Sequence, residues 1–407
     1  MPSVQTKRSR KLKFIKQTEL LNKAIKKDIA LPEILEQVGW TYNDLVYEKS
    51  HEKKWKPIDM PSLHDKRSRN ADIPVASFFS GCGGLDIGLE AAGFKHAACF
   101  EINELFCKTL RKNRPQWNVY GPPIHSGDVS NFEEICSVLD SRVSTSFPGL
   151  FVGGPPCQPF SIAANQRYIK NSDNFKRIGF AHEKNGNLFF DYVRLIKKYK
   201  PKVFLVENVP GLRDIDAGEQ IRSAIDDLSA SGYRVEEPLV IDAADYGVPQ
   251  QRNRLFLIGS LKQIKSCGFS LGMNREKIAC GNVLLGDNYV SEDLCNAETR
   301  EHAAASVLRY GVLNYGQRDH LGRVDRLDPS VPSKTVIAGG TSGGGRSHLH
   351  PEIPRTLSVR ESARLQTFPD NYIFLGPTAR QFTQVGNAVP PLLAACVGQA
   401  IMEAFFS

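Results

Sequence analysis

The sequence predicts an α/β protein with an open, mostly parallel sheet, and two observations carry that prediction. Short apolar runs at 75–79, 96–100, 150–152 and 203–206 are typical of buried strands, and residues 85–92 between the first two have helical spacing. The first and third runs pass directly into glycine-rich turns. Such turns at the carboxyl ends of parallel strands are where this fold class places ligands and chemistry.

Length and composition fit one large α/β domain with smaller additions. The chain has 407 residues, of which 41% are hydrophobic and 24% charged, so it can bury a sizeable core. No apolar run approaches the roughly 18 residues that cross a bilayer, and the basic amino terminus lacks the apolar stretch of a secretory signal. Nine cysteines without a Cys-x-x-Cys pair indicate reduced thiols and neither a metal site nor disulfides. We therefore expect a cytoplasmic protein without a membrane partner.

The amino-terminal region carries most of the net charge. Residues 1–70 hold 16 Lys and Arg against 9 Asp and Glu, a net +7 of the chain's +8. Residues 7–16 read as disordered and 18–27 as a short helix, while 31–49 resemble a helix-turn-helix with Thr41 as an N-cap. Two interpretations stay open: a basic arm that meets phosphates, and a solvated tail.

A nucleotide-type cofactor is indicated by the next segment. The turn at 80–84 follows the first strand, and Glu101 ends the second strand about 20 positions later, where a carboxylate accepts hydrogen bonds from a ribose. The crowded glycines and the lack of a phosphate-binding lysine favour an adenosyl group without pyrophosphate. Asp128 is placed to bind the adenine amino group.

Four further residues predict the chemistry. Cys157 follows two glycines and two prolines, which present its thiol on a stiff loop as a candidate nucleophile rather than as a structural cysteine. Glu207 ends a buried strand, where a carboxyl group can cap the next helix or, with its pKa raised by burial, can serve as a proton donor; from its position alone the helix cap is favoured. Arg252 and Arg254 alternate along a strand and share a face, which fits a clamp in the site or a pair of surface ion pairs.

At least six segments between residues 75 and 404 resemble, in order, the motifs of the DNA (cytosine-5)-methyltransferases of bacterial restriction–modification systems. They are Phe-Ser-Gly-Cys-Gly-Gly-Leu-Asp at 79–86, Pro-Pro-Cys-Gln-Pro-Phe-Ser at 155–161, Glu-Asn-Val at 207–209, and the stretches 245–254, 355–370 and 384–391. The resemblance implies a Rossmann-like S-adenosyl-L-methionine-dependent methyltransferase domain with a smaller target-recognition domain. The basic helical extension lies outside it.

The resemblance also implies roles for individual residues. The catalytic residues would be Cys157, Glu207, Arg252 and Arg254. The cofactor would be bound by Phe79, Gly81, Gly83, Glu101, Ile102, Asp128, Pro155, Leu188 and Asn387. DNA would be contacted by Gln158, Ser161, Arg167, Thr335 and Arg346. The loop at 162–187 would close over the DNA, although it is longer than in shorter members and has Asn185 where they carry a basic residue.

The implied reaction transfers a methyl group to carbon 5 of a cytosine that has left the duplex, through a covalent adduct with Cys157. It would protect DNA from a restriction endonuclease with which the protein forms no stable complex. Alternatives are an RNA cytosine-5 methyltransferase, an orphan DNA methylase, a DNA-binding regulator acting through the extension and an NAD-dependent dehydrogenase.

We expect a monomer associated with the nucleoid. The expected division is 1–72 for the extension, 73–260 for the cofactor-binding and catalytic domain, 261–350 for target recognition and 351–407 for a closing segment that returns to the catalytic domain.

Overall fold

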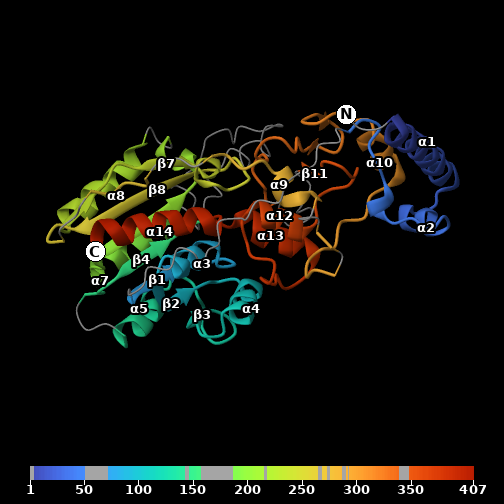
Figure 1. Cartoon of the computed structure of the whole chain (residues 1–407). Coiled ribbons are helices and arrows are strands. Elements are labelled where there is room, and N and C mark those ends of the chain that lie inside the picture. The colour runs from blue at the N-terminus through green and yellow to red at the C-terminus, as the bar shows by residue number, and fades with distance from the viewer. Residues whose placement is uncertain are drawn as a thin grey trace, which may run out of the picture. The chain divides into compact units, whose positions relative to one another are not determined.

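A computed structural model of the chain forms two compact units (Figure 1). The sheet unit comprises residues 61–247, 252–276 and 388–407, and the small unit comprises residues 1–60, 248–251 and 277–387. The structure describes residues 4–50, 72–142, 146–156, 187–214, 218–264, 268–272, 276–286, 290–291, 293–338 and 348–407.

The sheet unit is built on an eight-stranded sheet with the order β3-β2-β1-β4-β5-β8-β6, in which β7 also pairs with β8. Strands β1 to β5 pair in parallel, and β8 runs antiparallel to β5, β6 and β7. The strands are β1 (Ile73–Phe78), β2 (Phe94–Phe100), β3 (Val119–Tyr120), β4 (Leu150–Gly153), β5 (Val203–Asn208), β6 (Tyr233–Val235), β7 (Leu239–Asp242) and β8 (Asn253–Leu261). The α/β class expected from the sequence is confirmed.

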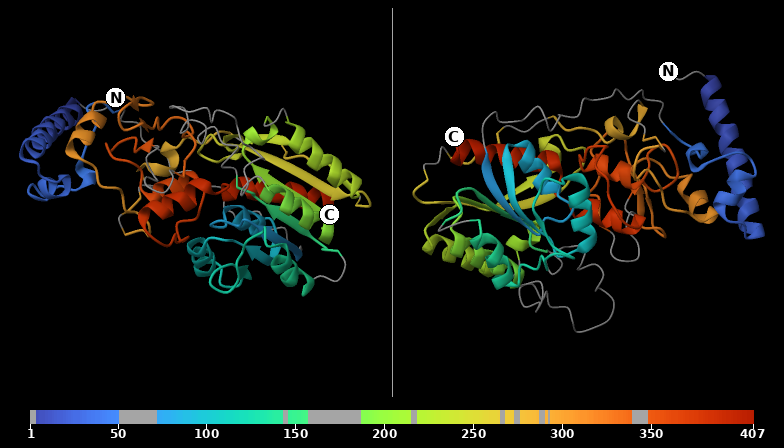
Figure 2. Two further views of the ribbon diagram at one scale, coloured as in Figure 1. Left: turned by 180° about the vertical axis from the view of Figure 1, so that it is seen from behind. Right: turned by 90° about the horizontal axis from the view of Figure 1, so that it is seen from below.

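Helices cover both faces of this sheet. Figure 2 shows α14, in red, on one side of the strands and α7 and α8, in green, on the other. The helices of the sheet unit are α3 (Gly84–Ala91), α4 (Glu104–Asn113), α5 (Phe132–Asp140), α7 (Asn187–Tyr199), α8 (Glu219–Ala230) and α14 (Pro391–Phe405), with 3-10 turns η3 (Pro210–Arg213) and η5 (Ala243–Tyr246).

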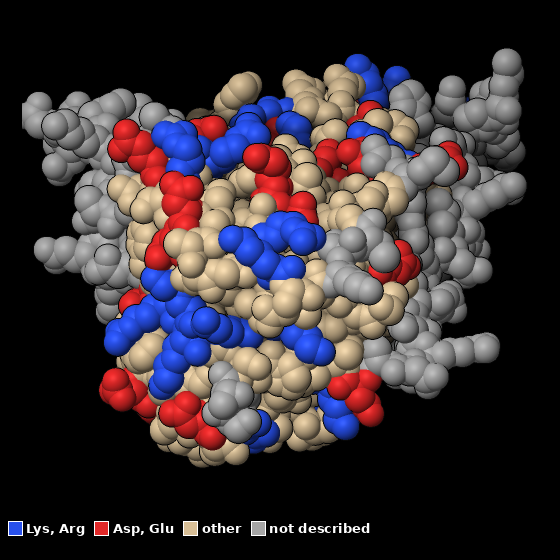
Figure 3. Space-filling model, turned by 90° about the vertical axis from the view of Figure 1, so that its left-hand side faces the viewer, with Lys and Arg blue, Asp and Glu red and all other residues tan. Residues whose placement is uncertain are grey.

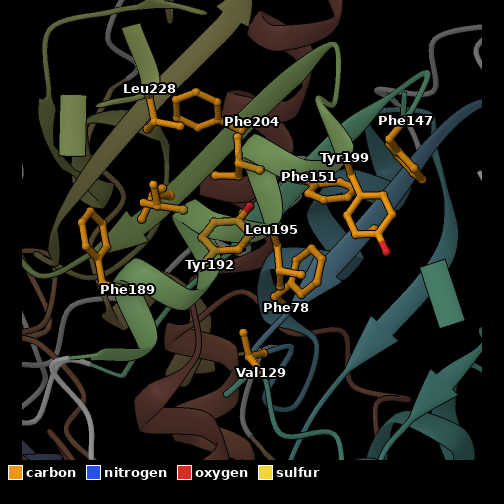
Figure 4. Close-up of a cluster of buried hydrophobic side chains, with 14 of the residues drawn as sticks. Phe78, Val129, Phe147, Phe151, Phe189, Tyr192, Leu195, Tyr199, Phe204 and Leu228 are labelled. Carbon is orange, nitrogen blue, oxygen red and sulfur yellow. The ribbon is translucent and has the colours of Figure 1, made fainter. Parts of the chain in front are cut away.

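An aromatic-rich core fills the space between the sheet and α5, α7 and α8 (Figure 4). Phe78 of β1 packs against Phe151 of β4 and Tyr192 of α7, with ring centroids 5.1 Å apart in both pairs. All three side chains are almost fully buried. The strand ends that carry the candidate site residues therefore rest on a well-packed base.

The opposite layer depends on a close approach between α3 and α14. A side chain added at Gly88 would place its Cβ 2.4 Å from the Ala394 Cβ and 2.4 Å from the Pro391 carbonyl oxygen. Gly398 makes a similar approach, with its added Cβ 2.8 Å from the Ala92 Cβ. Glycine is needed at these positions because the neighbouring atoms belong to packed helices and not to flexible side chains.

Residues 378–405 have the length and hydropathy of a membrane-spanning helix, with a mean hydropathy of 1.5, but 89% of that window is buried inside the protein. The segment is also interrupted, since α13 (Thr378–Asn387) ends before α14 begins at Pro391. Its apolar composition reflects the core position of α14.

The surface of the sheet unit at α7 and α8 is mixed in charge. On the face drawn in Figure 3, Lys and Arg lie beside Asp and Glu on a largely uncharged surface. Two ion pairs from α7 illustrate this: Lys197 Nζ lies 2.6 Å from Asp227 Oδ1, and Lys198 Nζ lies 3.6 Å from Asp140 Oδ2. Such balanced pairs contribute little stability and create no uniform field.

The small unit combines the amino-terminal extension with residues near the carboxyl terminus. Its elements are α1 (Val4–Lys27), α2 (Leu31–Glu36), η1 (Tyr42–Asp44), α9 (Gly281–Leu284), α10 (Ala304–Tyr310), β9 (Arg318–Asp319), β10 (Val324–Arg326), β11 (His348–Leu349), α12 (Val359–Leu365) and α13. Strands β11, β10 and β9 form a three-stranded sheet in that order.

The extension differs from its sequence-based interpretation in two ways. Residues 7–16, expected to be disordered, belong to α1, whose 24 residues run without a break. The helix expected after Thr41 is only the 3-10 turn η1, although Thr41 does form the predicted cap, a reciprocal capping box with Asp44. A helix-turn-helix therefore lacks its second helix here, because the chain after η1 becomes extended at Leu45.

The α3–α14 packing predicts the effect of one small substitution. Gly88→Ala inserts a methyl group where no space exists, so we expect a loss of about 1–3 kcal/mol in the free energy of unfolding. Urea denaturation measures this loss, and Ser223→Ala on the exposed face of α8 is the matched control, which should change stability by less than about 0.5 kcal/mol. Equal stability of both variants would contradict the close packing.

Candidate active site

The predicted site residues gather at the carboxyl ends of neighbouring parallel strands. Phe79 and Gly81 follow β1, Glu101 follows β2, and Glu207 is the last residue but one of β5. In the order β3-β2-β1-β4-β5, the connections after β1 and β4 lead in opposite directions. This is the switch point at which open α/β sheets form a crevice for ligands.

Glu101 is held rigidly beside the glycine turn. Its Oε2 accepts a hydrogen bond of 2.7 Å from the Gly81 backbone N–H, and its Oε1 accepts one of 2.7 Å from the Asn103 N–H. Burial raises the pKa of Glu101 to about 7, against the lowering effect of these two donors. Each oxygen keeps a further acceptor position, so the carboxylate is oriented to receive two hydroxyl donors from a ribose.

The turn after β1 contains three residues with positive φ angles. Phe79 has a φ of +58°, which is rare for a residue with a side chain, and Gly81 and Gly83 have φ values of +57° and +82°. The Phe79 ring lies edge-on to Tyr192, with centroids 6.4 Å apart. Backbone strain of this kind is held in place by its surroundings and is concentrated at ligand sites.

Other predicted cofactor residues lie on the same unit. Ile102 is 56% exposed directly after Glu101, where it offers an apolar surface beside that carboxyl group. Asp128 is partly exposed, and its Oδ1 accepts from the Ser130 N–H and hydroxyl. Leu188 is partly buried against the aromatic core. These residues can supply the apolar and polar contacts that an adenosyl group needs.

Two of the predicted cofactor residues have different surroundings. Pro155 is buried, and its carbonyl oxygen lies 3.4 Å from the Asn208 Nδ2 donor, which ties the loop after β4 to the end of β5. Asn387 is an exposed residue at the end of α13 in the small unit. The role of Asn387 at the cofactor stays a prediction.

Glu207 forms an ion pair with Arg254. The Arg254 Nε lies 2.8 Å from Glu207 Oε1, and both side chains are about one-seventh exposed, at 13% and 14%. The pairing register explains this contact, because Glu207 lies opposite Phe256 and residues 254 and 256 of one strand share a face. Burial raises the pKa of Glu207 and prevails over the positive charges of Arg254 and Arg252, which lower it.

Arg252 has a different environment from Arg254. Its side chain is 1% exposed, and one guanidinium nitrogen donates to the Ala388 carbonyl oxygen at 2.9 Å. Its backbone N–H donates to Asp242 Oδ1 at 2.9 Å. Arg252 thus fixes the chain entering β8 and adds positive charge near Glu207. The contact between Asp242 and Arg252 was not predicted from the sequence, because a carboxylate at the end of a strand is too common to indicate a particular partner.

The nucleophile loop begins beside Glu207. An added Cβ at Gly154 would lie 3.0 Å from Glu207 Oε2, so the backbone passes close to this carboxyl group. Strands β4 and β5 are parallel, with Gly153 opposite Val206. Cys157, which follows three residues later, lies outside the described residues, and its approach to Glu207 stays a prediction.

Among the predicted DNA-contacting residues, Gln158, Ser161, Arg167 and Arg346 lie outside the described residues. Thr335 is described, and its hydroxyl donates to the Gln251 carbonyl oxygen at 2.7 Å. This bond engages the hydroxyl within the small unit, and DNA contact by Thr335 stays a prediction.

Gln250 is a structural residue that sequence reasoning did not single out. It is fully buried, accepts from the Val336 N–H at 2.7 Å and donates to Gln366 Oε1 at 2.8 Å. The backbone of Pro249 and Gln251 also bonds to Ser333. The centre of the 245–254 motif therefore anchors residues 333–336. The sequence feature that could have pointed to Gln250 is its position in this motif, next to the arginines that were singled out.

One buried cluster bears on the question of a metal. Asp86, His96 and Cys99 carry potential ligand atoms within 4.8 Å of one another. Asp86 Oδ1 and His96 Nε2 lie 3.0 Å apart, and Trp117 stacks on the His96 ring at 4.0 Å. The second carboxylate oxygen of Asp86 and the His96 Nδ1 are buried without a hydrogen-bond partner among the described residues.

Comparison with known proteins places this geometry in a family. The sequence model described as C-5 cytosine-specific DNA methylase matches residues 73–403. The Type II methyltransferase M.Eco47II of Escherichia coli is 33% identical over 361 residues, covering 81% of this chain and 78% of the relative. The Type II methyltransferase M.PspPI of Psychrobacter is 32% identical, covering 81% and 79%.

Solved structures agree. A candidate DNA modification methyltransferase encoded within an Escherichia coli prophage has a TM-score of 0.65 and 26% identity, covering 81% of this chain and 98% of that one. Spodoptera frugiperda DNMT2 shares the fold with a TM-score of 0.54 at 15% identity, covering 79% and 97%. The chain therefore belongs to the family of C-5 cytosine-specific DNA methylases and is a DNA (cytosine-5)-methyltransferase of the Type II restriction–modification kind.

Proposed function

We propose that the protein methylates carbon 5 of a cytosine flipped out of a specific duplex sequence, with S-adenosyl-L-methionine as methyl donor and Cys157 as nucleophile. The observation that carries the proposal is the partly buried Glu207–Arg254 ion pair beside Gly154, which leads to the Cys157 loop. We propose further that the enzyme acts as a monomer in the cytoplasm, on nucleoid DNA. It would protect DNA from an endonuclease without forming a stable complex with it.

The residues present fit the proposed cofactor. Glu101, Phe79 and the exposed Ile102 line the carboxyl ends of β1 and β2, and Glu101 keeps acceptor positions for two ribose hydroxyls. When bound, the cofactor supplies an activated methyl group. The chain's own part is to orient the ribose through Glu101 and to hold the turn at Gly81 open for it.

Cys157 would begin the reaction by adding its thiolate to carbon 6 of the cytosine ring. This addition makes carbon 5 nucleophilic and places electron density on ring nitrogen 3. After methylation, loss of the carbon 5 proton restores the double bond to carbon 6 and expels the thiolate. The thiolate is thus regenerated, and water would accept the carbon 5 proton.

Glu207 would act at ring nitrogen 3. A carboxyl group whose pKa is raised by burial carries a proton at higher pH than an ordinary glutamate, so it can donate to this nitrogen as charge develops. Arg254 holds the carboxyl through Oε1, and Oε2, which lies beside Gly154, would serve ring nitrogen 3. Once Glu207 has given up its proton, Arg254 stabilises the carboxylate.

The adduct provides the first test. Cys157→Ser should abolish methyl transfer and the covalent complex with duplex DNA containing 5-fluorocytosine, while leaving cofactor binding near that of the unaltered protein. Denaturing electrophoresis detects the complex, and isothermal titration measures cofactor binding. Cysteine-to-serine exchange at Cys295, an exposed cysteine outside the site, is the control. Incorporation of radioactive methyl groups into DNA by the serine variant would overturn this mechanism. If the unaltered protein methylated RNA and not DNA, the proposed substrate would be wrong.

The proton role of Glu207 predicts a pH effect. Because the protonated form is active, the rate of a single turnover should fall as pH rises through the raised pKa of Glu207. Glu207→Gln should slow this turnover by roughly 10²–10⁴-fold and remove that alkaline fall. Rapid-quench measurements from pH 6 to 9 report the rate, and fluorescence anisotropy reports DNA binding. A variant with unchanged chemistry and weakened DNA binding would rule out proton donation.

The ribose role of Glu101 predicts a second pH effect. Hydroxyl donors stabilise the carboxylate, so ligand binding should favour the deprotonated form and affinity should rise as pH increases through about 7. Methylthioadenosine is a suitable ligand because it has the ribose but neither amino acid group. Titration calorimetry should show proton release on binding near pH 7, and Glu101→Gln should abolish that release. Release that persists in the variant would assign the proton to another group.

A further inference from the structure

The amino-terminal extension shares a hydrophobic core with the carboxyl-terminal half of the chain. Leu20, Leu21 and Ala24 of α1 are buried in one cluster with Ala304 and Val307 of α10. Leu31, Ile34 and Leu35 of α2, Leu45 and Ile353 complete the cluster. The extension is therefore built into the small unit, which also contains residues 333–336.

Hydrogen bonds add a second layer to this attachment. Gln17 is 1% exposed, and its side-chain amide pairs with the Val46 backbone in both directions, at 2.7 and 3.1 Å. The Glu48 N–H donates to the Gly311 carbonyl oxygen at 2.9 Å, and the Tyr47 hydroxyl donates to the His350 carbonyl oxygen at 3.0 Å. Such buried bonds hold the segment in one register.

A buried arginine depends on the extension. Arg326 of β10 is 1% exposed, and its guanidinium lies 3.5 Å from the centre of the Tyr47 ring and 4.0 Å from that of Tyr315. It donates to the carbonyl oxygens of Lys49, Leu313 and Pro351. A buried charge must keep its partners, so removing Tyr47 and Lys49 would leave this group without part of its solvation.

The outer face of α1 is strongly basic. Exposed basic side chains on this helix are Arg8, Lys11, Lys16, Lys23, Lys26 and Lys27, and Glu19 is the acid in the helix. Within the described part of the chain, no ion pair engages Arg8, Lys11, Lys23 or Lys26. Arg8 with Lys11 and Lys23 with Lys26 form two basic pairs on one side of the helix. The pairs are about 18 Å apart, from 1.5 Å of rise per residue, and Leu12, Ile15 and Glu19 lie between them on that side.

We infer that residues 4–50 are part of the DNA-reading unit and that the basic residues of α1 bind the phosphate backbone of duplex DNA. This inference rests on the proposed function, which makes duplex DNA the substrate. Charge complementarity supports it, because positive groups without internal partners neutralise phosphates and release counterions. The shared core matters as much, because it makes α1 a fixed surface of the unit instead of a loose tail.

A charge variant tests the inference. Changing Arg8, Lys11, Lys23 and Lys26 together to glutamine keeps good helix formers on an exposed face. We expect the dissociation constant for duplex DNA to rise at least about threefold at 0.1 M salt, and the slope of log affinity against log salt to decrease by about 1–3. Fluorescence anisotropy at several salt concentrations measures both quantities, and the midpoint of thermal unfolding confirms that the variant is folded.

Two controls make the result specific. Ser9→Gln with Asn22→Gln alters exposed positions of α1 without changing its charge and should leave the affinity unchanged. Changing Lys95, Lys108 and Lys112 of the sheet unit to glutamine lowers the net charge elsewhere. An equal loss of affinity in this second control, or an unchanged salt slope in the α1 variant, would overturn the inference.

Two further outcomes separate the inference from its alternatives. Leu12 and Ile15 are 61% and 45% exposed on α1. If changing both to serine weakened DNA binding more than the charge variant did, the helix would be an apolar docking surface and the inference would fail. If the wild-type protein formed no 5-methylcytosine, the proposed function would be refuted. If the wild-type protein methylated DNA normally and the α1 charge variant kept its DNA affinity and salt slope, only the inference would be refuted.

Discussion

The site depends on the pairing of β4 in parallel with a neighbour on each side. Val75 of β1 lies opposite Leu150, and Leu150 lies opposite Val203 of β5, so the carboxyl ends of three strands are set level with one another. A shift of one residue would turn Glu207 to the other face of the sheet. The aromatic core beneath β4 fixes this register, because Phe151 packs between the sheet and α7 and cannot exchange faces without leaving a cavity.

The same physical effect acts on two carboxyl groups for which we propose different tasks. Burial raises the pKa values of Glu101 and Glu207, but the two side chains have different partners. Glu101 accepts from two backbone donors, which are fixed and cannot give up a proton to it. Glu207 faces the charged side chain of Arg254, which can compensate a carboxylate formed during the reaction. Fixed backbone donors fit the proposed role of Glu101 as an acceptor, and the neighbouring positive charge fits the proposed role of Glu207 as a proton donor.

Much of the fold and the site could be predicted from the sequence, because their signals are local. The strands around Val75, Leu150 and Val203 are continuous apolar runs, as parallel strands buried on both faces require. Glu101 and Glu207 were found because each ends such a run. Local patterns could not show that Glu207 binds Arg254, since that contact joins residues 47 positions apart through the antiparallel pairing of β5 with β8.

The amino-terminal extension shows where prediction from local sequence patterns fails. Residues 7–16 have little periodicity of their own because their helix is stabilised by partners such as Gly311 and Glu352, far along the chain. The core that α1 needs is supplied in part by α10, so neither segment displays a complete amphipathic pattern alone.

A charge count over residues 1–70 detected the basic character but not its placement on a rigid surface. The physical distinction matters, because a fixed row of charges loses less conformational entropy on meeting phosphates than a tail does. The burial of Tyr47 against Arg326 is therefore as relevant to the proposed DNA contact as the lysines themselves.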